Sequence, residues 1–131
     1  MSQRPAAIGL LVCEHVIIEE STRNVTPVNC FARRIVQQFP SEPSTFVVFT
    51  LLNDASGEIN LDVTVQRLDT LEEIHRLSAS AVFHDQLQEM RCVFRIRNFS
   101  FPISGAYQVS LFADNEIIAQ RRFRVVQKEA S

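Results

Sequence analysis

Residues 101–125 read FPISGAYQVSLFADNEIIAQRRFRV, and their pattern is that of a β-hairpin. Apolar and polar residues alternate on each side of a short polar segment, as expected of two strands with one buried face each. Asp114-Asn115 is a two-residue turn signal, because both residue types tolerate the positive φ of tight hairpin turns. The inward residues of the two strands would be Tyr107, Val109, Leu111, Phe123 and Val125.

Short runs of the same kind fill the rest of the chain. Residues 58–67 alternate most regularly, and residues 45–52 are apolar almost throughout, which is typical of a strand covered on both faces. Turn residues separate the runs. We expect strands at residues 7–19, 25–31, 45–52, 58–67, 77–83, 90–97, 107–112 and 117–125. The pattern predicts an all-β fold, an antiparallel β-sandwich of seven or eight strands with an immunoglobulin-like or related topology.

Residues 29–39 fit two structures equally well. Phe31, Ile35 and Phe39 recur every four residues, and Asn29 could cap a short helix. The same residues also fit a strand followed by a loop. Period alone does not separate the two in so short an apolar run, so both alternatives stay open.

Length and composition indicate one globular domain, over residues 1–131. The chain has 131 residues, 46% of them hydrophobic and 21% charged, and a formal net charge of −2. This charge predicts no general attraction to nucleic acid or to anionic membranes. No apolar run reaches the roughly 20 residues of a membrane span, and the first residues lack a clear signal-peptide cleavage site.

The cysteines Cys13, Cys30 and Cys92 are odd in number and lie far apart in the sequence. No Cys-x-x-Cys motif supports a structural zinc site or a thioredoxin-like site. Free cysteines suit a reducing compartment, where they pack as small apolar residues. We therefore expect a cytoplasmic protein.

Motifs for cofactor binding or catalysis are missing. With only three glycines, Gly9, Gly57 and Gly105, the chain has no phosphate-binding loop and no dinucleotide fingerprint. No Gly-x-Ser-x-Gly motif marks a serine hydrolase. His84 and Asp85 are neighbours in an expected turn, which suits solvent better than a catalytic pair. We predict no cofactor and no catalytic residues.

A small cluster near the N-terminus has residue types that occur in metal and nucleophile sites. Cys13 and His15 lie two residues apart on an expected strand, hence on one face, with Glu14 between them. A zinc site needs about four ligands, and the other histidines and cysteines follow at no recognisable spacing. A packed cysteine beside a partly exposed histidine is the favoured interpretation, so we predict no metal.

The arginines form a candidate binding surface. They alternate with apolar residues on two expected strands, so each set shares one face. If the two strands lie in one sheet, the guanidinium groups would form a basic stripe that could bind carboxylates or phosphates of an acidic partner. A solvated face balanced by acidic residues is the competing interpretation. The residues of the candidate stripe are Arg91, Arg95, Arg97, Arg122 and Arg124.

Three segments in this order resemble a family of small uncharacterised bacterial β-sandwich proteins, carried as a domain of unknown function. They are the start LVCEHV at residues 11–16, the proline-flanked break before residues 46–52, and the hairpin motif Phe-Pro-x-x-Gly-x-Tyr at residues 101–107. The likeness covers nearly the whole chain. It implies a β-sandwich and a bacterial origin, and it implies no activity.

The leading functional hypothesis is a non-enzymatic module that binds another protein, or a second copy of itself, through a sheet edge or face. The first alternative is a domain that binds a small molecule or a glycan in the loops at one end of the sandwich. Against sugar stacking, the chain has no Trp and one Tyr. The second alternative is an enzyme of unrecognised type that uses His15, His75 or His84.

Overall fold

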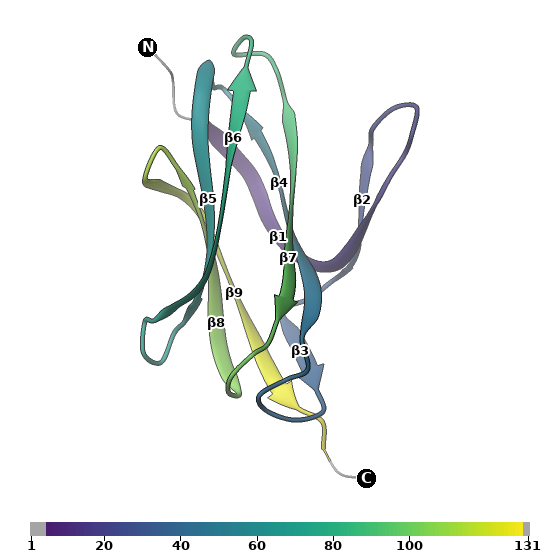
Figure 1. Cartoon of the computed structure of the whole chain (residues 1–131). Coiled ribbons are helices and arrows are strands. Elements are labelled where there is room, and N and C mark those ends of the chain that lie inside the picture. The colour runs from purple at the N-terminus through teal and green to yellow at the C-terminus, as the bar shows by residue number, and fades with distance from the viewer. Residues whose placement is uncertain (1–4, 130–131) are drawn as a thin grey trace.

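The computed structural model describes residues 5–129, which form nine β-strands and no helix (Figure 1). The strands are β1 (Ala6–Ile18), β2 (Val25–Cys30), β3 (Arg33–Val36), β4 (Ser44–Asn53), β5 (Gly57–Arg67), β6 (Glu73–Phe83), β7 (Met90–Phe99), β8 (Gly105–Ala113) and β9 (Glu116–Gln127). The prediction of an all-β fold is confirmed, but the strand count of seven or eight is wrong. Among the described residues, no helix could cross a membrane.

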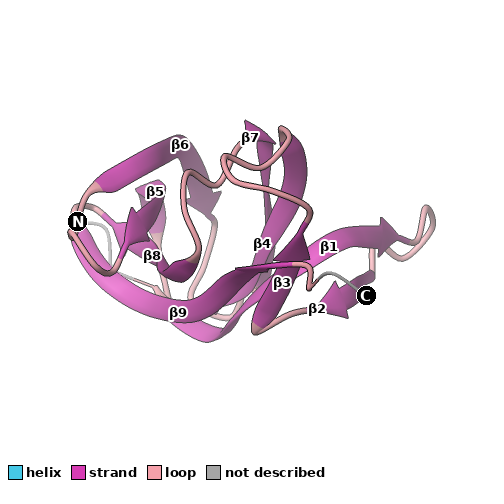
Figure 2. Cartoon of the chain, turned by 90° about the horizontal axis from the view of Figure 1, so that it is seen from below, coloured by secondary structure: helices cyan, strands magenta, loops and turns pink. Residues whose placement is uncertain are grey.

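The strands form two sheets that lie against each other as a sandwich (Figure 2). One sheet has four strands in the order β2-β1-β4-β7, and the other has five in the order β3-β9-β8-β5-β6. Neighbouring strands are antiparallel, as predicted, with one exception: β3 runs parallel to β9. The strands β2, β7, β3 and β6 are the edges of the two sheets.

The hairpin that was expected at the end of the chain is present as β8 and β9. Its turn consists of Asp114 and Asn115, whose φ angles are 46° and 69°. Positive φ at both turn residues matches the right-handed twist of the flanking strands. The residues that were expected to point inward are all buried: Tyr107, Val109, Leu111, Phe123 and Val125.

The core between the sheets is built around aromatic rings. Phe46 of β4 is fully buried, and the centres of four other phenylalanine rings lie within 6.3 Å of its own. These rings come from different parts of the chain: Phe31, Phe99, Phe101 and Phe123. Most pairs are edge-to-face, a geometry that contributes beyond the area buried. The inward row of β5 completes the core, as its alternation predicted: Ile59, Leu61, Val63 and Val65.

Residues 29–39 form no helix. Phe31 is buried in the core, whereas Ile35 is 58% exposed, so the four-residue period does not mark one buried face. Instead β3 pairs with β9, and backbone bonds at both ends extend the pairing (Arg124 N to Ala32 O, 2.8 Å; Lys128 N to Val36 O, 2.7 Å). An isolated short helix is marginal in water, while this pairing satisfies backbone groups of a sheet edge.

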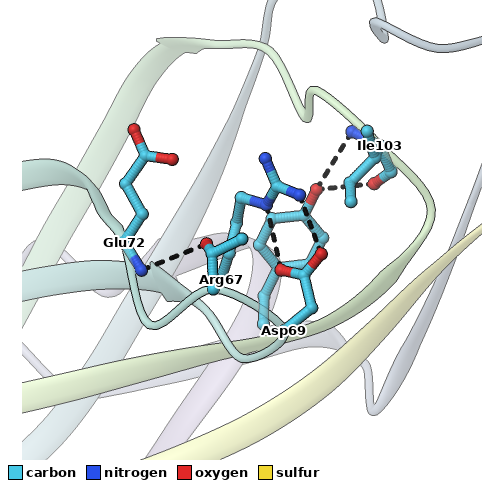
Figure 3. A network of polar contacts seen from close by, with 6 residues as sticks. Arg67, Asp69, Glu72 and Ile103 are labelled. Carbon is cyan, nitrogen blue, oxygen red and sulfur yellow. Dashed lines mark hydrogen bonds and ion pairs between the residues drawn. The ribbon is translucent and has the colours of Figure 1, made fainter.

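Tyr107 fixes the crossing from one sheet to the other (Figure 3). β7 and β8 belong to different sheets, and the connection between them contains Ile103, which lies close to Arg67 and Asp69. The Tyr107 hydroxyl donates to the carbonyl of Ile103 (2.6 Å) and accepts from its N–H (3.3 Å). Beside it, Arg67 and Asp69 form an ion pair (2.8 Å) at the end of β5. The connection is therefore held by hydrogen bonds between the side chain of the buried Tyr107 and the backbone of Ile103.

This arrangement predicts alkaline sensitivity. Burial raises the pKa of Tyr107 above its ordinary 10.0, partly opposed by the hydrogen bond from the Ile103 N–H. Because the pKa of Tyr107 is higher in the folded protein than in the unfolded chain, its contribution to stability is fully present below pH ~10. This contribution is lost as the pH rises through the folded-state pKa, because the phenol of the unfolded chain loses its proton at a lower pH. We expect Tyr107→Phe to lower stability by about 1 kcal/mol at neutral pH and to reduce the alkaline loss.

The chain has one Tyr and no Trp, so ultraviolet titration of the phenol reports Tyr107 alone. The midpoint should lie above 10.0 in the folded protein and return to about 10 in denaturant. A folded-state midpoint at or below the denatured one would contradict the burial of this hydroxyl.

Candidate interaction surface

The outer face of the four-stranded sheet is apolar. On β4 the core residues Phe46, Val48 and Leu52 alternate with a second apolar row that points away from the core. Strand register adds apolar residues of β1 and β7 beside that row. We call this surface the apolar face; it consists of Ile8, Leu11, Cys13, Val47, Phe49, Leu51 and Val93.

The residues of the apolar face cover one another. Phe49 lies opposite Leu11 on one side and Val93 on the other, and it is 8% exposed. Ile8 is 49% exposed, and Leu51 is half-buried. The prediction that β4 is covered on both faces therefore holds along the middle of the strand, where the outward Val47 and Phe49 are 2% and 8% exposed, whereas Leu51 is half-buried. The five-stranded sheet packs on the other side, so no second layer of strands within the described residues covers this face.

The outer face of the five-stranded sheet is mostly polar, with Val82 and Phe112 as apolar exceptions, and several of its polar side chains are paired. Arg122 donates from Nε to Oε1 of Gln108 (3.0 Å), and Gln120 donates to the hydroxyl of Ser110 (3.1 Å). Asp62 accepts a hydrogen bond from Ser78 and lies 3.6 Å from a guanidinium nitrogen of Arg76. An antiparallel sheet with one face to the core and one to water has this pattern. The four-stranded sheet departs from this pattern along β4, whose outward residues Val47, Phe49 and Leu51 are all apolar.

Three arginines line the β7 edge of the apolar face. Arg91, Arg95 and Arg97 are exposed and alternate with the inward residues of β7. Arg91 donates to Oδ1 of Asn24 (3.3 Å). Arg95 and Arg97 make no ion pair with any described residue. Val93 lies between Arg91 and Arg95 in this outward row, so the positive charge borders apolar surface directly.

The five candidate arginines do not form one stripe. The stripe required β7 and β9 to lie in one sheet, but they belong to different sheets because the chain crosses between layers after β7. Arg122 and Arg124 therefore lie on the outer face of the five-stranded sheet, on the opposite side of the sandwich. Only the β7 arginines remain together on one surface.

The N-terminal Cys-Glu-His cluster is dispersed by the strand. Cys13 is fully buried, and His15 is exposed. Glu14 points to the other side and forms an ion pair with Arg34 of β3 (2.9 Å). His75 packs against the ring of Phe99 (5.7 Å between centres). In the described part of the chain, no three His, Cys, Asp or Glu residues are placed to hold a metal ion.

One pair of cysteines lies close together in the structure, although their spacing in the sequence did not predict it. Cys13 of β1 and Cys30 of β2 are direct partners in the antiparallel register, although they are distant in the chain. The third cysteine, Cys92, is buried on the inner side of β7, where burial raises the pKa of its thiol to about 11. A hairpin signal at residues 21–24 could have suggested the pairing, but not its register.

A cavity of about 350 Å³ lies beside β3. Arg34 lines it, with its guanidinium over the ring of Phe31 (5.3 Å from guanidinium carbon to ring centre). Its Nη1 is buried and has no hydrogen-bond partner among the described residues. The other lining residues are Ile35, Val36, Gln37, Gln38, Ser41, Glu42 and Ser44. Its lining combines polar and apolar surface, and it opens to solvent.

Comparison with known proteins places the chain in a family without assigning an activity. Residues 9–126 match the family described as "Family of unknown function (DUF6941)". No curated protein matches the sequence. The matched region runs from Gly9 in β1 to Val126 in β9, so it includes every residue of the apolar face except Ile8, and it includes the outer face of the five-stranded sheet. The chain therefore belongs to this family of unknown function, DUF6941.

Proposed function

We propose that this protein is a non-enzymatic interaction module that binds a protein partner through the apolar face. The observation that carries this proposal is the contrast between the two outer surfaces. One is mostly polar with several paired side chains, and the other consists of apolar residues, of which Leu11, Leu51 and Val93 are half-buried and Ile8 is exposed. Contiguous exposed apolar surface bordered by polar residues marks interaction sites on soluble proteins.

The β7 arginines indicate the chemistry of the partner. Arg95 and Arg97 have no acidic partner within the described chain, and a guanidinium binds carboxylates with two parallel hydrogen bonds. An acidic segment with apolar residues would match both parts of the surface. The free edge of β7 could also accept an added strand. Symmetric pairing of β7 with a second copy would place arginines near one another, which disfavours self-association through this edge.

Further properties belong to the same proposal. The order of β1-β4-β7 in one sheet and β9-β8-β5-β6 in the other, with the Tyr107 hydroxyl bonded back to Ile103, supports an immunoglobulin-like topology. Three free cysteines support a cytoplasmic location, and a bacterial origin follows from the resemblance described above.

The proposal is tested by two matched substitutions, Val93→Glu on the apolar face and Val82→Glu on the outer face of the five-stranded sheet. Both valines point outward, so both variants should fold, as judged by thermal unfolding. Each purified protein is used to capture binding proteins from an extract of the source organism, with quantitative mass spectrometry. Val93→Glu should lose proteins that wild type and Val82→Glu retain. Identical captured sets for all three proteins would overturn the proposal.

The cavity beside β3 favours a second candidate, a site for a small molecule that carries a carboxylate. Arg34 could donate from its unpartnered Nη1 to such a group, and Gln37 and Ser41 supply further polar contacts. A thermal-shift screen with small carboxylates tests this candidate, because a ligand of the folded state raises the melting temperature. A shift that disappears in Arg34→Met, with no shift for matched neutral amides, would support it.

A further inference from the structure

The two cysteines at the β1–β2 pairing lie opposite each other in the register, as the cysteines of a cross-strand disulfide do. Cys13 and Cys30 are direct register partners. The adjacent bond runs from the N–H of Phe31 to the carbonyl of Val12 (2.9 Å), one residue beyond Cys30 and one before Cys13. This bond is the one that flanks a non-hydrogen-bonded pair, in which Cα atoms are typically about 4.5 Å apart. On the other flank the register skips Asn29, whose φ is 55°. Disulfides span Cα distances of about 4.4–6.8 Å.

The two thiols differ in access to solvent. Cys30 is exposed on the edge strand β2, whereas Cys13 is fully buried. Burial raises the pKa of the Cys13 thiol, and the nearby Cys30 raises it further, while a backbone hydrogen bond from Val28 acts in the opposite direction. The influence of Cys30 on Cys13 is a second sign that the two sulfur atoms are close. A reagent in solution therefore meets Cys30 first.

We propose that Cys13 and Cys30 form a dithiol site that reacts with low-molecular-weight disulfides and closes into a cross-strand disulfide. In the first step the thiolate of Cys30 attacks one sulfur of the small disulfide; a mixed disulfide forms and one small thiolate leaves. In the second step Cys13 loses its proton to solvent, and its sulfur attacks Sγ of Cys30. The second small thiolate leaves. Two protein thiols are oxidised, and one small disulfide is reduced to two thiols.

The structure also sets the order and the pH dependence of these steps. Attack by Cys13 requires its thiolate, and the raised pKa of Cys13 keeps that form scarce at neutral pH. The mixed disulfide on Cys30 should therefore accumulate first and then disappear, faster as the pH rises. The product would tie the edge strand β2 to β1 in its present register. This inference does not rest on the proposed function, although Cys13 is also a residue of the apolar face.

The test uses the purified full chain and oxidised glutathione, with intact-mass and peptide mass spectrometry. Three thiols should be titratable after denaturation before treatment, and one afterwards, with the mass lower by two hydrogens. A digest should contain the peptides of Cys13 and Cys30 joined. Reduced glutathione in excess should restore all three thiols.

Three single variants separate the roles. Cys92→Ser should form the disulfide as wild type does, because Cys92 lies elsewhere in the fold. Cys13→Ser should stop at one glutathione on Cys30, and Cys30→Ser should react more than about tenfold more slowly, because its remaining thiols are buried. If wild type also stops at the Cys30 adduct at pH values up to about 9, or if the joined peptides include Cys92, the inference is overturned.

Discussion

Replacing Phe46 with alanine should lower the free energy of unfolding by about 3–5 kcal/mol. Phe46 has no exposed surface, and its ring meets four other phenylalanine rings from β-strands and loops of both sheets. Truncation removes the buried ring and leaves a cavity that rigid neighbours fill only in part. Urea unfolding monitored by circular dichroism measures the change.

Phe112→Ala is the matched control for this substitution. Phe112 is half-buried on the outer face of the five-stranded sheet, where the guanidinium of Arg76 lies 5.8 Å from its ring centre. Removing the Phe112 ring should lower the free energy of unfolding by about 1 kcal/mol, because the site stays open to water. Equal costs for the two variants would show that Phe46 is not the centre of the core.

Reversing two charges beside the apolar face should weaken partner binding by about 100-fold or more. Arg95→Glu/Arg97→Glu places acidic groups where an acidic partner would meet two guanidinium groups, and like charges across an interface cost several kcal/mol. The affinity of proteins captured by wild type is measured by surface plasmon resonance at several salt concentrations. Wild-type binding should weaken with salt, and the variant should bind weakly at every salt concentration.

The chain supplies its own control for net charge. Arg122→Glu/Arg124→Glu changes the formal charge by the same amount, but on the opposite side of the sandwich. This variant should bind the partner within about threefold of wild type, because only long-range steering changes. Equal loss from both double variants would mean that net charge, rather than the β7 edge, controls binding. If Arg95→Glu/Arg97→Glu binds the partner as wild type does but self-associates, these arginines instead protect the free edge of β7 from pairing with another strand.

The hairpin of β8 and β9 shows what the sequence reveals well. Its alternation, its turn at Asp114-Asn115 and its inward residues were all predicted, because these depend on neighbours along the chain. Residues 33–36 show the opposite case. Their pairing with β9 joins segments about ninety positions apart, and their own residues fit a helix as well as a strand. Nothing local specifies the parallel register of β3.

The candidate surface was only partly predictable for the same reason. Alternation placed Arg91, Arg95 and Arg97 on one face of a strand, but it could not assign β7 and β9 to different sheets. The apolar outward row of β4 reads in the sequence as a strand buried on both sides. Whether a second layer covers such a row depends on the arrangement of the sheets. The pairing of Cys13 with Cys30 likewise requires the register of β1 and β2.

Site-specific photocrosslinking tests the central claim, that the apolar face is covered by a partner, most directly. A photoreactive amino acid is placed at Leu51 on the apolar face, or at Phe112 on the outer face of the five-stranded sheet, in the protein expressed in its source organism. Position 51 should yield a discrete adduct with another protein, rich in Asp and Glu at the attachment site, which Arg95→Glu/Arg97→Glu removes. Position 112 should yield none. Adducts at position 112 but not at position 51 would contradict the account.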